Sequence, residues 1–234
     1  MSRHPILQSL RQWGIAAIRT GIEHSPWREQ ILFRLPASTE KRIALTFDDG
    51  PDPDCTPFIL DQLAHYQWHA TFFLVGQRAE SHPALVDRIL QEGHSLGNHT
   101  YSHVNPAKLS MSALQEEMQR TDEVIRAAAP KYTARWFRPP WGQMTRAQRM
   151  QALHTGRRIV FWSFSVHDYA ASPEAILAAA TRALSIGVVQ FLRANKFNVL
   201  VSNTPGVMGM LAMAAAKYYS ILMNQIQGSD EEVT

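Results

Sequence analysis

The chain has 234 residues, of which 45% are hydrophobic. This composition allows one large α/β domain or two small ones and excludes global disorder. Lys and Arg number 23 against 20 Asp and Glu. Because this net charge of +3 is small and no block of basic residues stands out, the sequence does not favour a nucleic-acid partner. The single cysteine, Cys55, excludes an internal disulfide and a cysteine-based zinc cluster, whereas ten histidines leave metal binding by imidazole open.

The two ends of the chain are predicted to flank one domain. Residues 1–40 are expected to form a helical extension packed on it, because the apolar run 13–18 is too short and interrupted for the core of a signal peptide. Residues 204–234 are expected to form a helix and a polar tail. Their apolar run, 207–216, ends at Lys217 and is shorter than a bilayer requires. Membrane association is therefore possible but unsupported, and neither a compartment nor an oligomeric state is indicated.

Strand-like and helix-like stretches alternate along the chain. Short apolar runs predict strands at residues 43–47, 70–75, 158–164 and 197–201. Helices are predicted to begin near Pro57, near Ser81 and Pro83 (ending at Gly93), at a capping box of Ser112 and Gln115 (ending near residue 129), and near Ser172 and Pro173. This alternation indicates a parallel sheet covered by helices, as an open sheet or as a barrel.

Two adjacent carboxylates, Asp48 and Asp49, follow the first predicted strand in the stretch 43-IALTFDDGP-51. Like charges in contact repel each other, and one tends to become protonated unless a cation lies nearby. In parallel α/β folds the loops at the C-terminal ends of the strands carry function. The pair is therefore either an ordinary polar turn or part of a site that contains a cation.

Two histidines supply the second half of such a site. His99 and His103 lie four residues apart in 97-GNHTYSH-103, a spacing that allows both to bind one metal ion and that would place both rings on one face of a helix. Asp49 is a suitable third ligand. Two histidines and one carboxylate, with open positions for water, are typical of a catalytic metal centre.

Two later stretches add further polar groups. Arg138 in 135-RWFRPPWG-142 precedes two prolines that stiffen the turn, and its guanidinium suits a carboxylate partner. The main-chain N–H of Trp141 could serve as an oxyanion donor. Asp168, in 161-FWSFSVHDYA-170, follows the end of another predicted strand.

Taken in this order, TFDDGP, HATFFLVG, HTYSH, RPPWG and FWSFSVHDY resemble the polysaccharide deacetylase family, also called the NodB-homology domain or carbohydrate esterase family 4. The resemblance covers about residues 42–170. It implies a distorted (β/α) barrel over residues 41–203 and a hydrolase that removes N-acetyl groups from a carbohydrate. The implied substrates are peptidoglycan, a chitin-like oligomer, or an exopolysaccharide or lipid-linked sugar.

The resemblance also assigns roles to individual residues. It implies that Asp49, His99 and His103 bind a divalent metal, with zinc as the default and cobalt, nickel or manganese as alternatives. Asp48 is implied as the general base, Arg138 as the residue that orients it, and the Trp141 amide as an oxyanion donor. In the family, the aspartate at the position of Asp168 supports a general-acid histidine.

The chain departs from the family pattern near its C-terminal end. No histidine follows His167, so the late Leu-x-x-His-Asp motif with its general acid is absent from this sequence. His167 itself is predicted to face away from the metal, because neighbours in an extended segment point in opposite directions. The barrel is therefore expected to be incomplete or altered there, unless residues 188–191 refill the gap. A catalytically weak or inactive carbohydrate-binding relic is the alternative to an enzyme.

Overall fold

The computed structural model describes residues 21–22, 26–35, 42–162, 164–165 and 198–203. Its strands are β1 (Ile31–Leu32), β2 (Arg42–Gly50), β3 (Thr71–Leu74), β4 (Ser95–Asn98), β5 (Trp136–Phe137), β6 (Arg158–Val160), β7 (Phe164–Ser165) and β8 (Asn198–Asn203). Its α-helices are α2 (Cys55–His65), α3 (Gly76–Ser81), α4 (Pro83–Gln91), α5 (Met111–Ala128) and α6 (Arg146–His154). Short 3₁₀ helices are η1 (Pro26–Glu29), η2 (Pro106–Lys108) and η3 (Pro140–Gly142).

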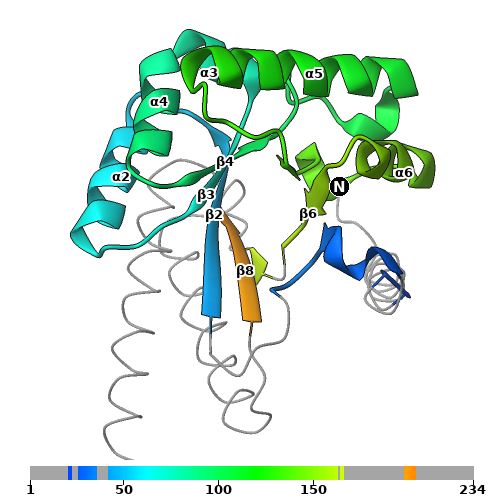
Figure 1. Ribbon diagram of the computed structural model, residues 1–234, viewed down its shortest axis with the longest axis horizontal. Coiled ribbons are helices and arrows are strands. Elements are labelled where there is room, and N and C mark those ends of the chain that lie inside the picture. Colours follow the sequence, from blue (N-terminus) through cyan, green and yellow to red (C-terminus); the bar gives the residue numbers. More distant parts are fainter. Residues whose placement is uncertain (1–20, 23–25, 36–41, 163, 166–197, 204–234) are drawn as a thin grey trace, which may run out of the picture.

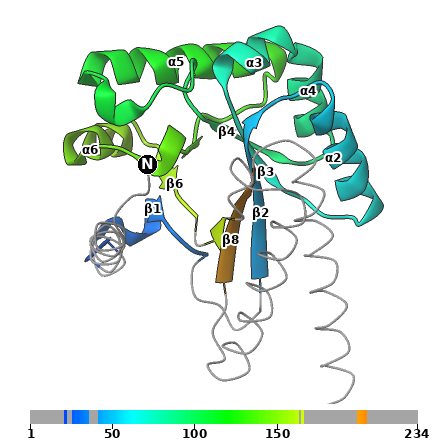
Figure 2. The same cartoon turned by 180° about the vertical axis from the view of Figure 1, so that it is seen from behind.

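The strands form one sheet in the order β1-β6-β5-β4-β3-β2-β8-β7, and every neighbouring pair is parallel. The predicted strand 158–164 is in fact two strands, since β6 lies next to one edge of this order and β7 at the other. Only residues 161–163 connect them, so Val160 and Phe164 can be at most about 14 Å apart. The sheet must therefore curl, as Figures 1 and 2 show. This confirms the predicted (β/α) barrel type.

The central strand β3 explains why its sequence is a continuous apolar run. Phe72 and Leu74 belong to the main core, where they pack with residues of α2 and α4. Phe73 points to the opposite side and packs with Val160 of β6. A strand buried on both faces needs apolar residues at every position. Helices α2 to α6 form an arc around the outside of the curved sheet (Figures 1 and 2).

The helix boundaries agree with the sequence in part. Pro57 lies in the first turn of α2 and Pro83 is the first residue of α4, as expected. The predicted cap at Ser112 is wrong, because α5 begins two residues earlier and Ser110 Oγ accepts the amide hydrogen of Ala113 at 3.1 Å. A full capping box, formed by Thr145 and Gln148, instead opens α6, a helix that the sequence reading did not predict.

Some expectations fall wholly or partly on residues outside those described. The C-terminal helix and tail, the helix near Ser172, and the altered end of the barrel belong to this group, and the domain boundaries stay predictions. The last predicted strand is confirmed as β8, which pairs with β2. Residues 31–32, from the segment assigned to the N-terminal extension, pair with β6 as the edge strand β1. Among the described helices, none has the length and apolar character needed to cross a bilayer.

Gly97 of β4 allows the aromatic ring of Phe73, on the neighbouring strand β3, to pack closely against β4. A Cβ atom at Gly97 would lie 2.4 Å from Cδ1 of the buried Phe73. We expect Gly97→Ala to lower the free energy of unfolding by about 1–3 kcal/mol through overpacking, as measured by urea denaturation. Gly21→Ala is the control, because a Cβ there meets nothing within 4 Å. Equal stability of the two variants would contradict this account of the core.

Candidate metal centre

The carboxylate pair lies within the end of strand β2 rather than after it, because β2 continues to Gly50. Asp49 has a φ of 67°, and the register with β3 shifts between Phe47 and Gly50. In a regular strand, neighbouring side chains would point to opposite faces. The left-handed residue and the register shift break this alternation, so that Asp48 and Asp49 can both face the site.

The two histidines lie in a turn that follows β4, and the helical arrangement considered for them is wrong. β4 ends at Asn98, His99 comes directly after it, and both Thr100 (φ 66°) and His103 (φ 56°) adopt left-handed backbone conformations. This tight turn brings the two imidazole centroids to 5.1 Å. The rings are therefore brought together by an irregular loop instead of by helical periodicity.

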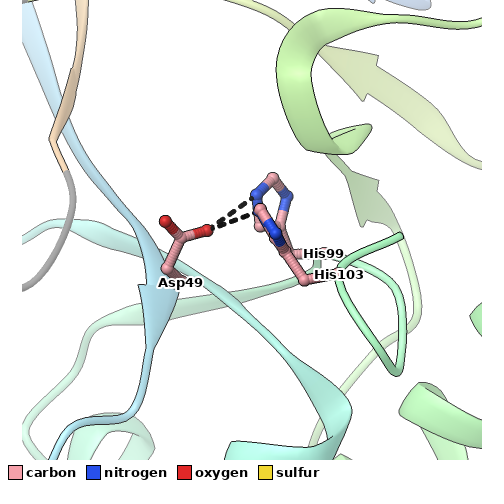
Figure 3. A group of neighbouring side chains, drawn as sticks. All are labelled: Asp49, His99 and His103. Carbon is pink, nitrogen blue, oxygen red and sulfur yellow. Dashed lines mark ion pairs between the residues drawn. The ribbon is translucent and has the colours of Figure 1, made fainter. Parts of the chain in front are cut away.

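Asp49 and the two histidines converge as the sequence predicted. Asp49 Oδ1 lies 3.2 Å from His99 Nε2 and 2.9 Å from His103 Nε2 (Figure 3). One ligand atom from each residue lies within 4.8 Å of the others. His99 is buried, whereas Asp49 and His103 are partly exposed. The cluster is thus closed on one side and open on the other, as a site that exchanges ligands requires.

The hydrogen bond made by Nδ1 of His99, the ring nitrogen that does not face Asp49, indicates that this cluster suits a cation. His99 Nδ1 lies 2.6 Å from the carbonyl oxygen of Arg138. Because a carbonyl can only accept, Nδ1 must carry the hydrogen, and a neutral ring then presents the lone pair of Nε2 to Asp49. Asp49 Oδ1 is inaccessible to solvent and has no hydrogen-bond partner. At 3.2 Å, a proton or a metal ion must lie between Nε2 and Oδ1, and a set of two histidines and one carboxylate fits a metal ion.

The two imidazoles, where they are protonated, also keep Asp49 ionised through hydrogen bonds and positive charge. Burial raises the pKa of this carboxyl, but the contacts and charges of His103 and His99 lower it more. The resulting pKa is well below the ordinary value for an aspartate. Asp49 is therefore ionised over the whole physiological range and is ready to bind a cation.

Arg138 and Asp48 form the predicted pair. The Arg138 side chain is fully buried, and its Nη1 donates to Asp48 Oδ1 at 2.5 Å and to Thr46 Oγ1 at 2.8 Å. Its remaining nitrogens donate to main-chain carbonyls, Nε to Val160 at 3.1 Å and Nη2 to Phe161 at 3.0 Å. Burial lowers the pKa of Arg138 and Asp48 raises it, with a net decrease, but a guanidinium remains charged. Asp48 is thus held in one orientation.

Trp141 lies at the exposed rim of the site. Its backbone is left-handed (φ 62°), its side chain is 62% exposed, and its ring centroid is 5.6 Å from that of His103. The next residue, Gly142, also has a positive φ, and a Cβ there would lie 2.8 Å from the ring of Trp162. The predicted use of the Trp141 amide as a donor stays a prediction. Asp168 lies outside the described residues.

The sequence reading did not single out Thr46, whose hydroxyl accepts from Arg138 beside Asp48. A signal was present, because residues two apart on a strand share a face and Thr46 is polar in an otherwise apolar run.

Comparison with known proteins decides the family. The family model for polysaccharide deacetylases matches residues 36–160, which include every described residue of the site. The chain belongs to the polysaccharide deacetylase family. It is 40% identical over 144 residues to a peptidoglycan-N-acetylglucosamine deacetylase of Bacillus cereus, an alignment that covers 61% of this chain and 52% of that protein. It is 35% identical over 156 residues to a chitooligosaccharide deacetylase of Rhizobium leguminosarum bv. trifolii, covering 64% of this chain and 72% of that protein.

Solved structures of the same family share the fold of this polysaccharide deacetylase family member. A family 4 carbohydrate esterase from Streptomyces lividans in complex with acetate superposes with a TM-score of 0.65 at 27% identity, covering 80% of this chain and 91% of that one. A family 4 pseudoenzyme from Bacillus anthracis reaches a TM-score of 0.69 at 22% identity, covering 82% and 64%. At that identity the second likeness concerns the fold alone. The chain spans only about half the length of the first Bacillus cereus relative.

Replacement of Asp49 tests the candidate metal site of this family member directly. Loss of an outer-shell partner typically weakens metal binding by roughly 10- to 100-fold. We expect Asp49→Asn to weaken zinc binding by more than this, because it removes a charged ligand. Zinc affinity is measured by competition with a chromophoric chelator. Asp54→Asn is the matched control, since Asp54 is exposed and its side chain makes no capping bond. Equal zinc affinity in both variants would exclude Asp49 as a ligand.

Proposed function

We propose that this chain is a metal-dependent hydrolase that removes N-acetyl groups from a carbohydrate. The observation that carries the proposal is the adjacency of two differently held carboxylates, Asp48 paired with Arg138 and Asp49 facing His99 and His103. The named relatives act on peptidoglycan N-acetylglucosamine and on chitooligosaccharides. The proposed substrate class is therefore a polymer or oligomer that contains N-acetylglucosamine.

Asp49, His99 and His103 would hold the metal ion, with zinc as the expected ion and cobalt, nickel or manganese as acceptable substitutes. A divalent ion bound by such ligands lowers the pKa of water and polarises a carbonyl oxygen. Imidazole and carboxylate ligands also suit a site at which the ion keeps positions open for substrate.

The chain's own groups supply the remaining steps. Asp48 accepts a proton from the attacking water, and Arg138 keeps the carboxylate oriented for this transfer. The main-chain N–H of Trp141 donates to the acetyl oxygen as negative charge develops there. The exposed ring of Trp141 beside His103 forms part of the surface on which the sugar rests. The departing amine must gain a proton, which the protonated Asp48 or solvent can supply. Loss of a dedicated general acid typically slows such a reaction by about 10²- to 10⁴-fold.

Acetate release tests this function. Metal-stripped protein is refilled with zinc or cobalt and incubated with chitin oligomers and with peptidoglycan. We expect metal-dependent acetate release that falls by about 10²- to 10⁴-fold in Asp48→Asn, since the general base is removed. Asp54→Asn should retain the activity.

The opposite result would favour the alternative. If folded protein that holds one metal ion per chain releases no acetate from either substrate, the chain is a carbohydrate-binding relic of the fold. Both outcomes use the same metal-loaded protein, so a lack of metal cannot imitate a lack of catalysis.

A further inference from the structure

One side chain of helix α5 holds the turn that separates the two histidines. Glu117 Oε2 accepts the amide hydrogens of Tyr101 and Ser102, each at 2.8 Å. Its second oxygen, Oε1, accepts from the hydroxyl of Ser102, also at 2.8 Å. All the hydrogen bonds that the described structure gives to this carboxylate therefore go to the two residues in the middle of the His99–His103 segment.

The turn needs such support because its backbone is unfavourable by itself. Thr100 and His103 both have positive φ values, a conformation that residues other than glycine rarely adopt. Such conformations persist only where the surrounding structure determines them from several sides. The carbonyl groups of the turn are fixed as well, because the amides of Gly76 and Gln77 donate to Thr100 O and Tyr101 O at 3.0 Å each. Glu117 provides the complementary restraint on the N–H groups.

The residue before the turn is fixed independently by the same helix. Asn98 Nδ2 donates to the main-chain oxygen of Met118 and to Asp122 Oδ1, each at 2.7 Å. Its Oδ1 accepts the amide hydrogen of Thr100 at 2.9 Å. Helix α5 thus fixes the start of the turn through Asn98, whereas Glu117 binds the amides of Tyr101 and Ser102 in the middle of the turn.

We propose that Glu117 is a positioning residue for the metal centre. This proposal rests on the function proposed above. Through the amides of Tyr101 and Ser102 it fixes the distance and orientation of His103 relative to His99. It acts by the reach of its two oxygens to the turn, since it contacts neither imidazole directly among the described interactions. Outer-shell groups that orient metal ligands typically change metal affinity by about 10- to 100-fold when they are removed.

Two substitutions separate reach from charge. In Glu117→Gln the amide oxygen can still accept from both main-chain amides, and the NH₂ group can donate to the Ser102 hydroxyl. Glu117→Asp keeps the charge but shortens the side chain by one methylene group, so its oxygens no longer reach the turn. Glu116→Gln and Glu116→Asp are matched controls, because Glu116 is the exposed neighbour on the same helix.

Zinc affinity, measured by chelator competition on protein that circular dichroism shows to be folded, is the deciding quantity. We expect Glu117→Asp to weaken zinc binding by about 10- to 100-fold and Glu117→Gln to bind nearly as tightly as the unmodified chain. The visible absorption of the cobalt-loaded protein should change in Glu117→Asp only, since the ligand geometry changes there. Neither Glu116 variant should differ from the unmodified chain.

Two results would overturn the proposal. Unchanged zinc affinity in Glu117→Asp, with a lower melting temperature of the metal-free protein, would assign Glu117 a purely structural role. Weakened zinc binding in Glu117→Gln, with unchanged affinity in Glu117→Asp, would assign the effect to charge instead of position. Because zinc affinity is measured without substrate, a chain that binds zinc but releases no acetate would fail the proposed function and leave this inference standing.

Discussion

Arg138 joins the two halves of the site, because its side chain binds Asp48 while its main chain binds the histidine segment. The guanidinium is fully buried near the rings of Phe73 and Trp162, whose centroids lie 4.1 and 5.9 Å from it. A buried charge is strongly destabilising unless it is paired and its donors are satisfied. Here one carboxylate, one hydroxyl and two carbonyl oxygens satisfy it. The ends of β2 and β6 are therefore held in fixed positions around this one side chain.

The main-chain groups of Arg138 extend this arrangement to the proposed metal ligands. Its amide donates to Asn98 O at 3.0 Å, and its carbonyl oxygen accepts from His99 Nδ1. The first bond continues the parallel pairing of β4 and β5, and the second selects the imidazole tautomer whose Nε2 faces Asp49. A change that displaces Arg138 would therefore affect both the proposed base and a proposed ligand. The parallel sheet makes this shared role of Arg138 possible, because the C-terminal ends of β2, β4 and β5 lie at the same end of the sheet.

The sequence predicted which side chains meet at the site better than the backbone geometry that brings them together. Asp49, His99 and His103 were identified from residue type and spacing, and the pairing of Arg138 with Asp48 from the family resemblance. The structure brings both groups together. The left-handed conformations of Asp49, Thr100 and His103 had no signal, because positive φ is ordinarily announced by glycine and none of these residues is glycine. Glu117 could not be found either, since its partners lie 15 and 16 residues earlier and depend on that same turn.

The structure also explains how two adjacent carboxylates can coexist at the end of β2. Asp48 is neutralised by a resident cation, the buried guanidinium of Arg138. Asp49 is directed by its positive φ toward two imidazoles and would be neutralised by an exchangeable cation. Because the two charges have separate partners, the Asp48–Arg138 pair and the curled sheet around it do not depend on the proposed metal ion. The arrangement thus separates the part of the site that supports folding from the part that can be emptied and refilled.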